Sequence, residues 1–166
     1  MNTMNLTVAP LLNEDCKIVI DLILPIQQIE FNVPITIEGQ PDLLDIESNY
    51  QHGGGNFWGV KIDSELVGTI ALLNIGHQAG ALRKMFVKKE FRGREFGIAR
   101  LLLEALLSFC AENNITDIYL GTVDMLKAAH RFYEKNSFKE IDVAELPGYF
   151  PRMMADNKFY HLHLIA

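Results

Sequence analysis

The sequence predicts an α+β (mixed α/β) domain, built on a central, mixed but mostly antiparallel sheet of about six to seven strands with about four helices. Three observations predict it. Short polar turns join three successive β-rich segments, which is typical of an antiparallel meander. A long apolar helix then separates the third of these strands from a fourth, and a strand, crossover helix and strand in one sheet make a parallel pair. Two more β-rich segments follow the last helix.

Length and composition indicate one globular domain over residues 1–166. The chain is 49% hydrophobic and 22% charged, and none of its apolar runs approaches the ~20 residues of a membrane span. The first residues lack the basic patch and apolar core of a signal peptide, so we expect a soluble, cytoplasmic protein without a membrane partner. The two cysteines, Cys16 and Cys110, indicate neither a disulfide framework nor a cysteine metal site. A net charge of −6 argues against a nucleic-acid partner and mildly favours cationic small substrates.

The first part of the chain predicts two helical regions. Asn13 is a candidate N-cap for a helix that Pro25 interrupts, so a kink or two helical pieces are expected. Residues 32–39 form a loop, and Pro41 suits the first position of a second helix. The glycine run 53–55 ends that helix.

The three strands of the meander follow. Residues 57–62 and 66–75 are rich in β-formers around the polar turn Asp63-Ser64-Glu65, which predicts a hairpin. Residues 76–80 turn the chain into a third strand at 81–87.

The second half supplies the parallel strand, two helices and the last strands. The helix after residue 97 is the most regular, with apolar residues at helical spacing at Ile98, Leu101, Leu102, Ala105, Leu106 and Phe109. The strand at 117–122 must pair in parallel with the strand that ends at Val87. Asp124 is a candidate cap for a last helix through Lys135, and strands are expected at 138–143 and 158–165.

The segment from Phe91 to Ala99, between a strand and the long helix, is the strongest indication of a ligand site. It contains Arg92, Gly93, Arg94 and Gly97 in a chain that is acidic overall. A helix N-terminus presents N–H groups and the positive end of its dipole, and nearby arginines add charge. The pattern predicts a ligand that carries phosphate.

Two motifs resemble the GNAT superfamily of acyl-CoA-dependent N-acyltransferases. The first is Arg94-Glu95-Phe96-Gly97-Ile98-Ala99, which fits the superfamily's cofactor loop. The second runs from Lys127 to Phe138 and is similar to its alanine-rich helix ending in Phe-Tyr, a short turn and Phe. Two departures are present: Arg92-Gly93 lies two residues further upstream than in many members, and Ser137 replaces a common glycine. Asn136 tolerates a left-handed turn, so we expect the turn to persist.

The resemblance implies how an acyl-CoA binds. The backbone of Met85, Phe86 and Val87 pairs with the pantetheine arm as an added strand would, and the N–H groups from Arg94 to Ala99 hold the pyrophosphate. Either Arg92 or Arg94 contacts phosphate, and the sequence leaves this choice open. The full set of residues predicted at the cofactor is Met85, Phe86, Val87, Arg92, Gly93, Arg94, Glu95, Phe96, Gly97, Ile98, Ala99, Thr122, Phe132 and Tyr133.

The resemblance also implies a mechanism. A backbone N–H near Phe86 stabilises the oxyanion, and Tyr133 is the candidate general acid for the departing thiolate. The alternative for Tyr133 is a tyrosine that only packs at the edge of the core. The base stays open among Glu30, Glu38, Asp45, Glu47 and a chain of waters.

The remaining polar and aromatic candidates are expected to have other roles than acyl transfer itself. Cys110 lies among leucines and is expected to be buried, and His130 is expected on the surface or at the cofactor rim. His161 and His163 share a strand face but lack a third metal ligand, so no metal is expected. Tyr149 and Phe150 lie where they can wall the acceptor pocket, form a lid or make a dimer contact.

The predicted function is transfer of an acetyl group from acetyl-CoA to a primary amine of a small molecule, peptide or protein, by direct attack and without a metal. The alternative is a non-catalytic module that binds or senses acyl-CoA. A nucleotide-binding protein is disfavoured because the sequence contains no Gly-Lys-Ser/Thr loop after a strand. The acceptor, the acyl-chain preference and the oligomeric state, including a homodimer, stay open.

Overall fold

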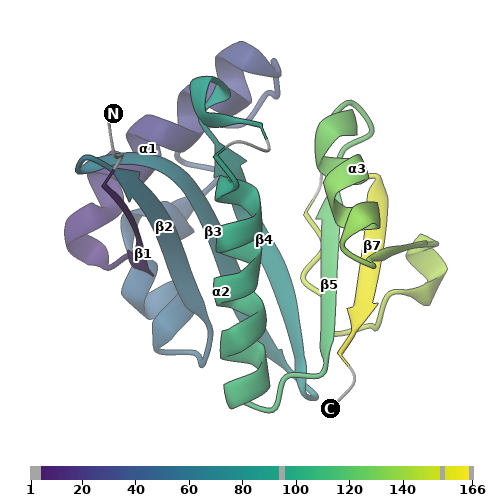
Figure 1. Ribbon diagram of the computed structural model, residues 1–166. Helices are drawn as coiled ribbons and strands as arrows, with labels where there is room; N and C mark the ends of the chain where they lie inside the picture. Colours follow the sequence, from purple (N-terminus) through teal and green to yellow (C-terminus); the bar gives the residue numbers. More distant parts are fainter. Residues whose placement is uncertain (1–4, 94–95, 154–155, 165–166) are drawn as a thin grey trace.

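The computed structural model describes residues 5–93, 96–153 and 156–164, and these form a seven-stranded sheet in the order β1-β2-β3-β4-β5-β7-β6. Within this described part β4 and β5 are parallel and the other neighbours are antiparallel, which confirms the predicted α+β class (Figure 1). The strands are β1 Leu6–Pro10, β2 Asn56–Ile62, β3 Glu65–Gly76, β4 Ala79–Val87, β5 Asp117–Thr122, β6 Lys139–Ile141 and β7 Lys158–His163. The α-helices are α1 Cys16–Pro25, α2 Ile98–Glu112 and α3 Lys127–Lys135.

The meander has the turns that its sequence predicts. Asp63 and Ser64, between β2 and β3, both have positive φ, as a two-residue hairpin turn of type I′ requires. His77 and Gln78, between β3 and β4, also both have positive φ. Strand β1 pairs with β2 at the sheet edge and is absent from the sequence-based prediction. Its five residues alternate only weakly between apolar and polar types, and four of them are exposed. The sequence of this strand therefore lacks the pattern that a half-buried strand shows.

The first helical region begins differently from the sequence-based prediction. Helix α1 ends at Pro25 and continues as a π-helical turn over Ile26–Glu30, which are the two pieces that Pro25 predicts. The prediction that Asn13 caps this helix is wrong. The Asn13 side chain instead donates to Asp45 Oδ1 (3.0 Å) and accepts from the Glu47 backbone N–H (3.0 Å). It therefore ties the start of α1 to the second helical region.

The second helical region consists of two short turns. Pro41 occupies the first position of a 3-10 turn, Pro41–Leu44, as predicted. The chain leaves helical geometry at Asp45 and then forms a π-helical turn, Glu47–Gln51. Leu43 and Tyr50 are buried, so their contacts with the sheet hold a segment that has little regular helix of its own.

Each face of the sheet carries its own apolar cluster. On one face Leu102, Leu106 and Cys110 of α2 pack with β-strand residues and with Tyr133 of α3. On the other face Val19 and Ile23 of α1 pack with the two short turns and with β2 and β3. None of the helices in the described ranges is long and apolar enough to cross a membrane.

Strands β4 and β5 separate soon after they pair. Their register runs from Ala79 opposite Asp117 to Ala81 opposite Tyr119, and in the described chain the pairing ends there. Figure 1 shows the two strands diverging toward the top of the view, with α2 beside β4 and α3 beside β5. The carboxyl ends of both strands therefore border one opening, where ligands of such units bind.

Candidate functional site

A cavity of about 1030 Å³ lies at this opening and brings the two predicted motifs together. It is bordered by the end of β4, the loop before α2, the start of α2, and α3. Ten of the predicted cofactor residues line it: Met85, Phe86, Val87, Arg92, Gly93, Gly97, Ile98, Ala99, Phe132 and Tyr133. Arg94 and Glu95 lie outside the described residues. Phe96 and Thr122 are not lining residues, because Phe96 packs edge-on against Phe91 (5.6 Å between centroids) and Thr122 is buried in β5.

The N-terminus of α2 is open toward the cavity. Gly97 is the N-cap with φ of 63°, and no side chain caps the helix. The first N–H groups of an α-helix have no partner within the helix, and here they belong to the cavity-lining residues Ile98, Ala99 and Arg100. Gly93, with φ of 130°, also needs a conformation that glycine adopts readily. Both glycines therefore allow the loop before α2 to adopt a backbone conformation that other residues adopt rarely.

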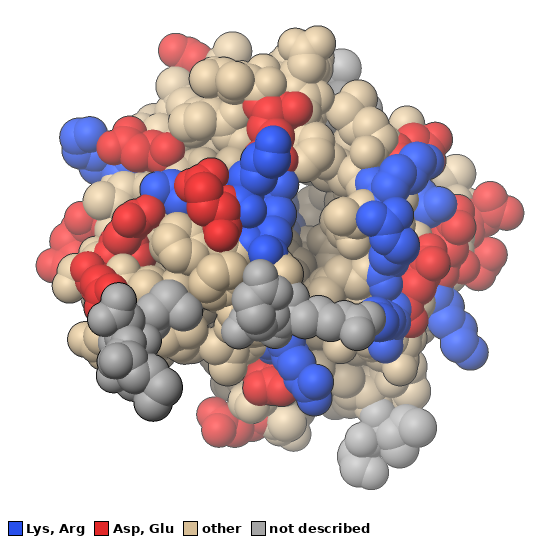
Figure 2. All heavy atoms as spheres, turned by 45° about the horizontal axis from the view of Figure 1, so that its top comes forward, with Lys and Arg blue, Asp and Glu red and all other residues tan. Residues whose placement is uncertain are grey.

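Among the described residues, the charged side chains on the cavity wall are all positive. Arg92, Arg100, Lys127 and Lys135 line it, and the described lining residues include neither Asp nor Glu. Figure 2 shows the molecule hollowed between groups of Lys and Arg side chains, while acidic side chains lie around them. A chain with a net charge of −6 thus presents a cationic cavity, which suits a ligand with several phosphates.

Arg92 has a protein partner in addition to its place in this wall. Its guanidinium forms an ion pair with Glu30, with Nη2 2.8 Å from Oε1, and its Nε donates to the Val87 carbonyl at 2.8 Å. It also lies over the Phe31 ring, 5.6 Å from the centroid. These contacts join the loop before α2 to the turn after α1, so Arg92 shapes the cavity mouth through them.

Strand β4 is irregular where it borders the cavity. Lys84 has φ of 53°, and the register with β3 shifts between Thr69 and Ala71. The Thr69 hydroxyl donates to the Lys84 carbonyl at 2.7 Å and fixes this bulge. Residues 82–87 are thereby displayed along an edge that has no strand partner on the β5 side in the described chain. Unpaired strand edges accept an added strand.

Tyr133 combines a buried ring with a place in the cavity wall. The side chain is 6% exposed and packs against Phe132, Phe138 and Tyr160, with centroids 5.7 to 6.1 Å apart. Burial raises the pKa of its phenol above the usual value. The hydroxyl therefore stays protonated at neutral pH and is available as a donor.

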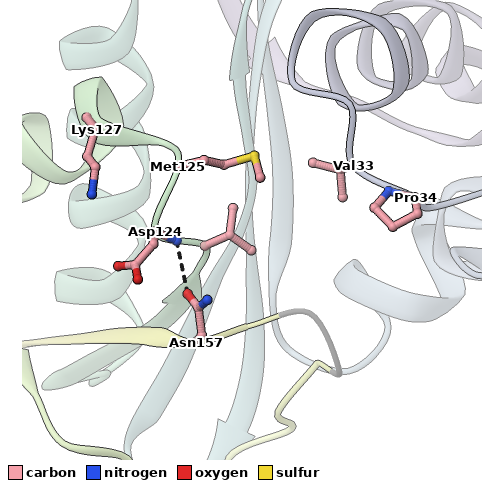
Figure 3. Close-up of a pocket in the computed structure, with 7 residues that line it drawn as sticks. Val33, Pro34, Asp124, Met125, Lys127 and Asn157 are labelled. Carbon is pink, nitrogen blue, oxygen red and sulfur yellow. Dashed lines mark hydrogen bonds between the residues drawn. The ribbon is translucent and has the colours of Figure 1, made fainter.

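A second, smaller pocket of about 440 Å³ adjoins the cavity and shares Met125 and Lys127 with it. Figure 3 shows Val33 and Pro34 on one side of it and Asp124, Met125 and Asn157 on the other. The Asp124 backbone N–H donates to Asn157 Oδ1 at 3.0 Å, which ties the end of β5 to the segment before β7. The prediction that Asp124 caps α3 is wrong, since α3 begins at Lys127 with Leu126 as N-cap and no capping side chain.

The four carboxylates considered as bases lie outside the lining of both pockets. Glu30 is paired with Arg92, and Glu47 accepts from the Asn13 backbone N–H at 2.9 Å. The Asn13 side chain and the Ser48 backbone donate to Asp45 and lower the pKa of its carboxyl. Glu38 is exposed. The structure thus gives three of them structural partners and brings none of the four into a pocket wall.

Cys110 and His130 both lie in the interior of the protein. Cys110 is fully buried, and burial raises the pKa of its thiol to about 12, which makes it unreactive. His130 is not on the surface as predicted. It is 4% exposed, and its Nε2–H donates to the Val123 carbonyl at 2.9 Å. The polar residues around His130 suggested a surface position, and the sequence does not show that the partner is the backbone carbonyl of the segment before α3.

The remaining candidates lie in β7 and in the loop before it. His161 and His163 both lie on Asp117 Oδ1, at 2.8 and 3.0 Å, and the described residues contain no group of three or more potential metal ligands. Tyr149 stacks on His77 with centroids 4.0 Å apart, and Phe150 packs against Phe159.

Sequence reasoning missed part of the cavity wall. Ile26 and Phe31 come from the turn after α1, whose role in the wall has no local signal. Phe91 and Arg100 flank the first motif, and the others belong to the second motif and its approach: Met125, Leu126, Lys127, Ala128, Ala129, Lys135 and Asn136. The two alanines were visible in the sequence, since small side chains on one helical face permit close approach of a ligand.

Comparison with solved structures supports the fold. An acetyltransferase of the GNAT family from Staphylococcus aureus Mu50 superposes with a TM-score of 0.92 at 39% identity, over 96% of this chain and 99% of that one. The PaiA N-acetyltransferase of Thermoplasma acidophilum, solved in complex with coenzyme A, has a TM-score of 0.72 at 19% identity, over 96% and 99% of the two chains. The second likeness concerns the fold alone.

Comparison by sequence gives relatives and a family. The N-acetylaspartate synthetase of Xenopus tropicalis is 36% identical over 112 residues, which make up 64% of this chain and 41% of that protein. The human N-acetylaspartate synthetase is 33% identical over 114 residues, 64% and 36% of the two chains, so this chain spans less than half of these relatives. The model of the acetyltransferase (GNAT) family matches residues 20–138, which include both motifs and most of the cavity wall. The chain therefore belongs to the GNAT acetyltransferase family.

Proposed function

We propose that this protein is an N-acetyltransferase that transfers the acetyl group of acetyl-CoA to a primary amine. One observation carries the proposal: a single cationic cavity joins the open N-terminus of α2, the unpaired edge of β4 and Tyr133. These are the three parts that a bound acyl-CoA needs, for its pyrophosphate, its pantetheine arm and its thioester. Relatives named N-acetylaspartate synthetases and N-acetyltransferases support the same reaction class.

The cofactor residues have distinct roles in this proposal. Backbone N–H groups of Ile98 and Ala99 receive the pyrophosphate, and cationic side chains such as Arg100 and Lys135 neutralise further phosphate charge. Met85, Phe86 and Val87 pair with the pantetheine arm along the β4 edge. Gly93 belongs to the loop that approaches the phosphates, and Phe132 borders the arm.

Direct transfer requires an electrophilic carbonyl, an amine and a stabilised leaving group. A backbone N–H near Phe86 donates to the carbonyl oxygen as the amine attacks, and coenzyme A thiolate leaves. Tyr133 donates a hydrogen bond to that thiolate. A free thiol has a pKa of ~8.5 and a free phenol one of ~10, and burial raises the phenol further. The hydroxyl therefore acts mainly as a hydrogen-bond donor that stabilises the thiolate.

The acceptor amine enters through the smaller pocket in this proposal. That pocket adjoins the cavity and opens between the 33–34 loop and the segment after β5 (Figure 3). The carboxylates named as bases are outside its lining, so water at this opening is the proposed proton acceptor. A lysine-type amine, with a pKa of ~10.4, needs more help to lose its proton than an α-amino group at ~7.7–8.0.

Thiol release tests the proposal. Purified protein is mixed with acetyl-CoA and a panel of amines, and free coenzyme A is followed with a thiol reagent; amine-dependent release and an acetylated product in mass spectrometry are expected. Acetyl-CoA, longer acyl-CoAs and ATP are compared by thermal shift in parallel. Stabilisation by acetyl-CoA without release for any amine would favour the non-catalytic acyl-CoA-binding module, and stabilisation by ATP alone would contradict both.

A further inference from the structure

Arg83 lies in β4 where the two parallel strands separate. The last register pair joins Ala81 to Tyr119, so Arg83 stands two residues beyond it, level with Gly121 of β5. Across the opening, the carboxylate of Asp156 occupies the space over Gly121, where an added Cβ would lie only 2.4 Å from Oδ2. Asp156 directly precedes Asn157, which lines the smaller pocket. Arg83 and Asp156 therefore lie beyond the last paired residues of the two parallel strands, and Asp156 is next in sequence to a residue of the proposed acceptor pocket.

The guanidinium of Arg83 lacks a carboxylate partner within 4.0 Å among the described residues. Its hydrogen bond there goes from Nη2 to the Met153 thioether, at 2.9 Å, and a thioether is a weak acceptor. Arg92 and Arg100, by contrast, each pair with a glutamate. Arg83 is only half-exposed, and a partly buried charge costs free energy unless an opposite charge or several acceptors compensate it.

The charges around Arg83 leave a positive surplus. We call Asp42, Arg83, Lys84, Arg152 and Asp156 the β4 charge cluster. Within it Lys84 lies 3.6 Å from Asp42 and also donates to Gln40 Oε1 at 2.6 Å, so this pair is matched. Arg83 and Arg152 remain with one carboxylate, that of Asp156. Burial raises the pKa of Asp156 although Arg83, Arg152 and Lys84 act to lower it, and its protonation would only enlarge the surplus.

The distance along β4 limits the size of a ligand that bridges this surplus and the thioester. Arg83 and Phe86 are three residues apart, which is about 10 Å at most along a strand. An arginine side chain and a backbone N–H that point into the same opening shorten this span. A molecule of amino-acid size can therefore place a carboxylate at Arg83 and its amine near Phe86.

We infer that the acceptor is a small amine that also carries a carboxylate, and that Arg83 is the specificity-determining residue that binds this carboxylate. The inference rests on the proposed acetyl transfer and names the class of its acceptor. The planar guanidinium matches a carboxylate through two parallel N–H···O bonds. Met153 is a weak acceptor that a carboxylate can replace, and the carboxylate supplies the one negative charge that the β4 charge cluster lacks.

Matched acceptors test the inference. Thiol release is compared for lysine and cadaverine, tyrosine and tyramine, tryptophan and tryptamine, and leucine and isoamylamine, with the amino-acid amides as neutral controls of similar size. The wild type is expected to favour the carboxylate-bearing member of at least one pair by tenfold or more in kcat/KM. Arg83→Met should lower kcat/KM for that amino acid by about 10- to 100-fold, the range for a lost charged hydrogen bond. Its decarboxylated partner should change little.

Three further variants separate recognition from folding. Arg83→Lys keeps the charge and loses the two-pronged geometry, so partial retention of the preference is expected. Met153→Leu removes the thioether partner and should keep the preference. Arg131→Met removes an exposed arginine outside the cavity lining and should leave both acceptors unchanged. The KM for acetyl-CoA and the thermal midpoint are measured for each variant.

The outcomes are distinct. Equal wild-type activity on both members of every pair, or an equal loss on both in Arg83→Met, would overturn the inference and leave acetyl transfer standing. Absence of thiol release from every amine would overturn the proposed function and the inference with it. A loss confined to the carboxylate-bearing acceptor, with an unchanged KM for acetyl-CoA, would support the role of Arg83.

Discussion

At the scale of single residues, Tyr133 offers a clean test because the proposed chemistry needs only its hydroxyl. Tyr133→Phe keeps the ring that packs against Phe132, Phe138 and Tyr160. We expect the variant to bind acetyl-CoA as the wild type does and to lose about 100-fold or more in kcat, the usual effect of removing one hydrogen-bond donor to a developing anion. Binding is measured by calorimetry and turnover by thiol release.

Tyr160→Phe is the matched control for Tyr133→Phe. Tyr160 lies beside Tyr133, with ring centroids 5.7 Å apart, but its hydroxyl donates to Glu134 at 2.7 Å and it does not line the cavity. Its loss should reduce stability more than turnover. Full activity in Tyr133→Phe would remove this hydroxyl from the chemistry and leave the packing role.

His130 links protonation to stability. Burial lowers the pKa of its imidazole, so the folded protein prefers the neutral form that donates to the Val123 carbonyl. As the pH falls below ~6.5, the unfolded chain takes up the proton first, and the free energy of unfolding decreases until the folded imidazole is protonated too. Urea denaturation between pH 7.5 and pH 5 should show this decrease. In His130→Gln the slope should be smaller, and an unchanged slope would assign the pH dependence to other groups.

At the scale of elements, the start of α2 depends on the left-handed conformation of Gly97. An added Cβ there meets nothing within 4 Å, so Gly97→Ala should act through backbone strain alone. We expect a loss of about 1 kcal/mol in the free energy of unfolding and weaker binding of acetyl-CoA, because a methyl group would enter the phosphate loop. Gly148→Ala is the control, since its site is equally open and lacks a positive φ. Equal stability of the two variants would argue against strain at Gly97.

The end of α3 calls for the opposite substitution. Ser137, not Asn136 as the sequence suggested, adopts the left-handed conformation, with φ of 75°, and the Phe138 N–H closes the turn on the Tyr133 carbonyl at 3.0 Å. Glycine is favoured at this position of a helix C-terminus. Ser137→Gly should therefore raise the free energy of unfolding by about 1 kcal/mol. Chemical denaturation measures it, and a destabilised variant would show that the serine makes a compensating contact.

The elements that were predictable from sequence are those with strong local signals. The meander, α2 and the parallel β5 follow from turn residues and apolar spacing. The exposed edge strand β1 and the broken turns after Pro41 do not, because tertiary contacts of Leu43 and Tyr50 decide them. The Asn13 and Asp124 caps failed for a related reason: Asn13 bonds to a distant segment, and the backbone of Asp124 is tied to Asn157.

The residues of the site also divide into those with a local sequence signal and those without one. The phosphate loop and the Phe132-Tyr133 segment lie in continuous motifs, so both were found. The pairing of Arg92 with Glu30 and the position of Arg83 opposite Asp156 join residues more than 60 positions apart in the chain. Single-sequence patterns carry no signal for such contacts, which arise only when distant segments of the chain meet in the folded domain.

At the scale of the whole molecule, the charge at the cavity is opposite in sign to the net charge of the chain. The chain carries −6 overall, yet Arg92, Arg100, Lys127 and Lys135 line the cavity, and no carboxylate of the described part of the chain lines it. The dissociation constant for acetyl-CoA should therefore increase several-fold between 50 mM and 500 mM NaCl, because salt shortens the screening length of these charges from ~14 Å to ~4 Å. S-acetylpantetheine, which lacks phosphates, is the control and should bind independently of salt. A salt-independent affinity for acetyl-CoA would argue against phosphate binding in this cavity.

The short pairing of β4 with β5 separates what natural selection can change from what it must preserve. Ala79, Gly80 and Ala81, together with the apolar cluster beneath α2, hold the two halves of the sheet together. Beyond them the smaller pocket is bordered in part by loop residues, Val33, Pro34 and Asn157, whereas Met85, Phe86 and Val87 of β4 line the larger cavity. Under the proposed function, substitutions in those loops should change the choice of acceptor at less cost in stability and in acyl-CoA binding than substitutions in the β4 edge.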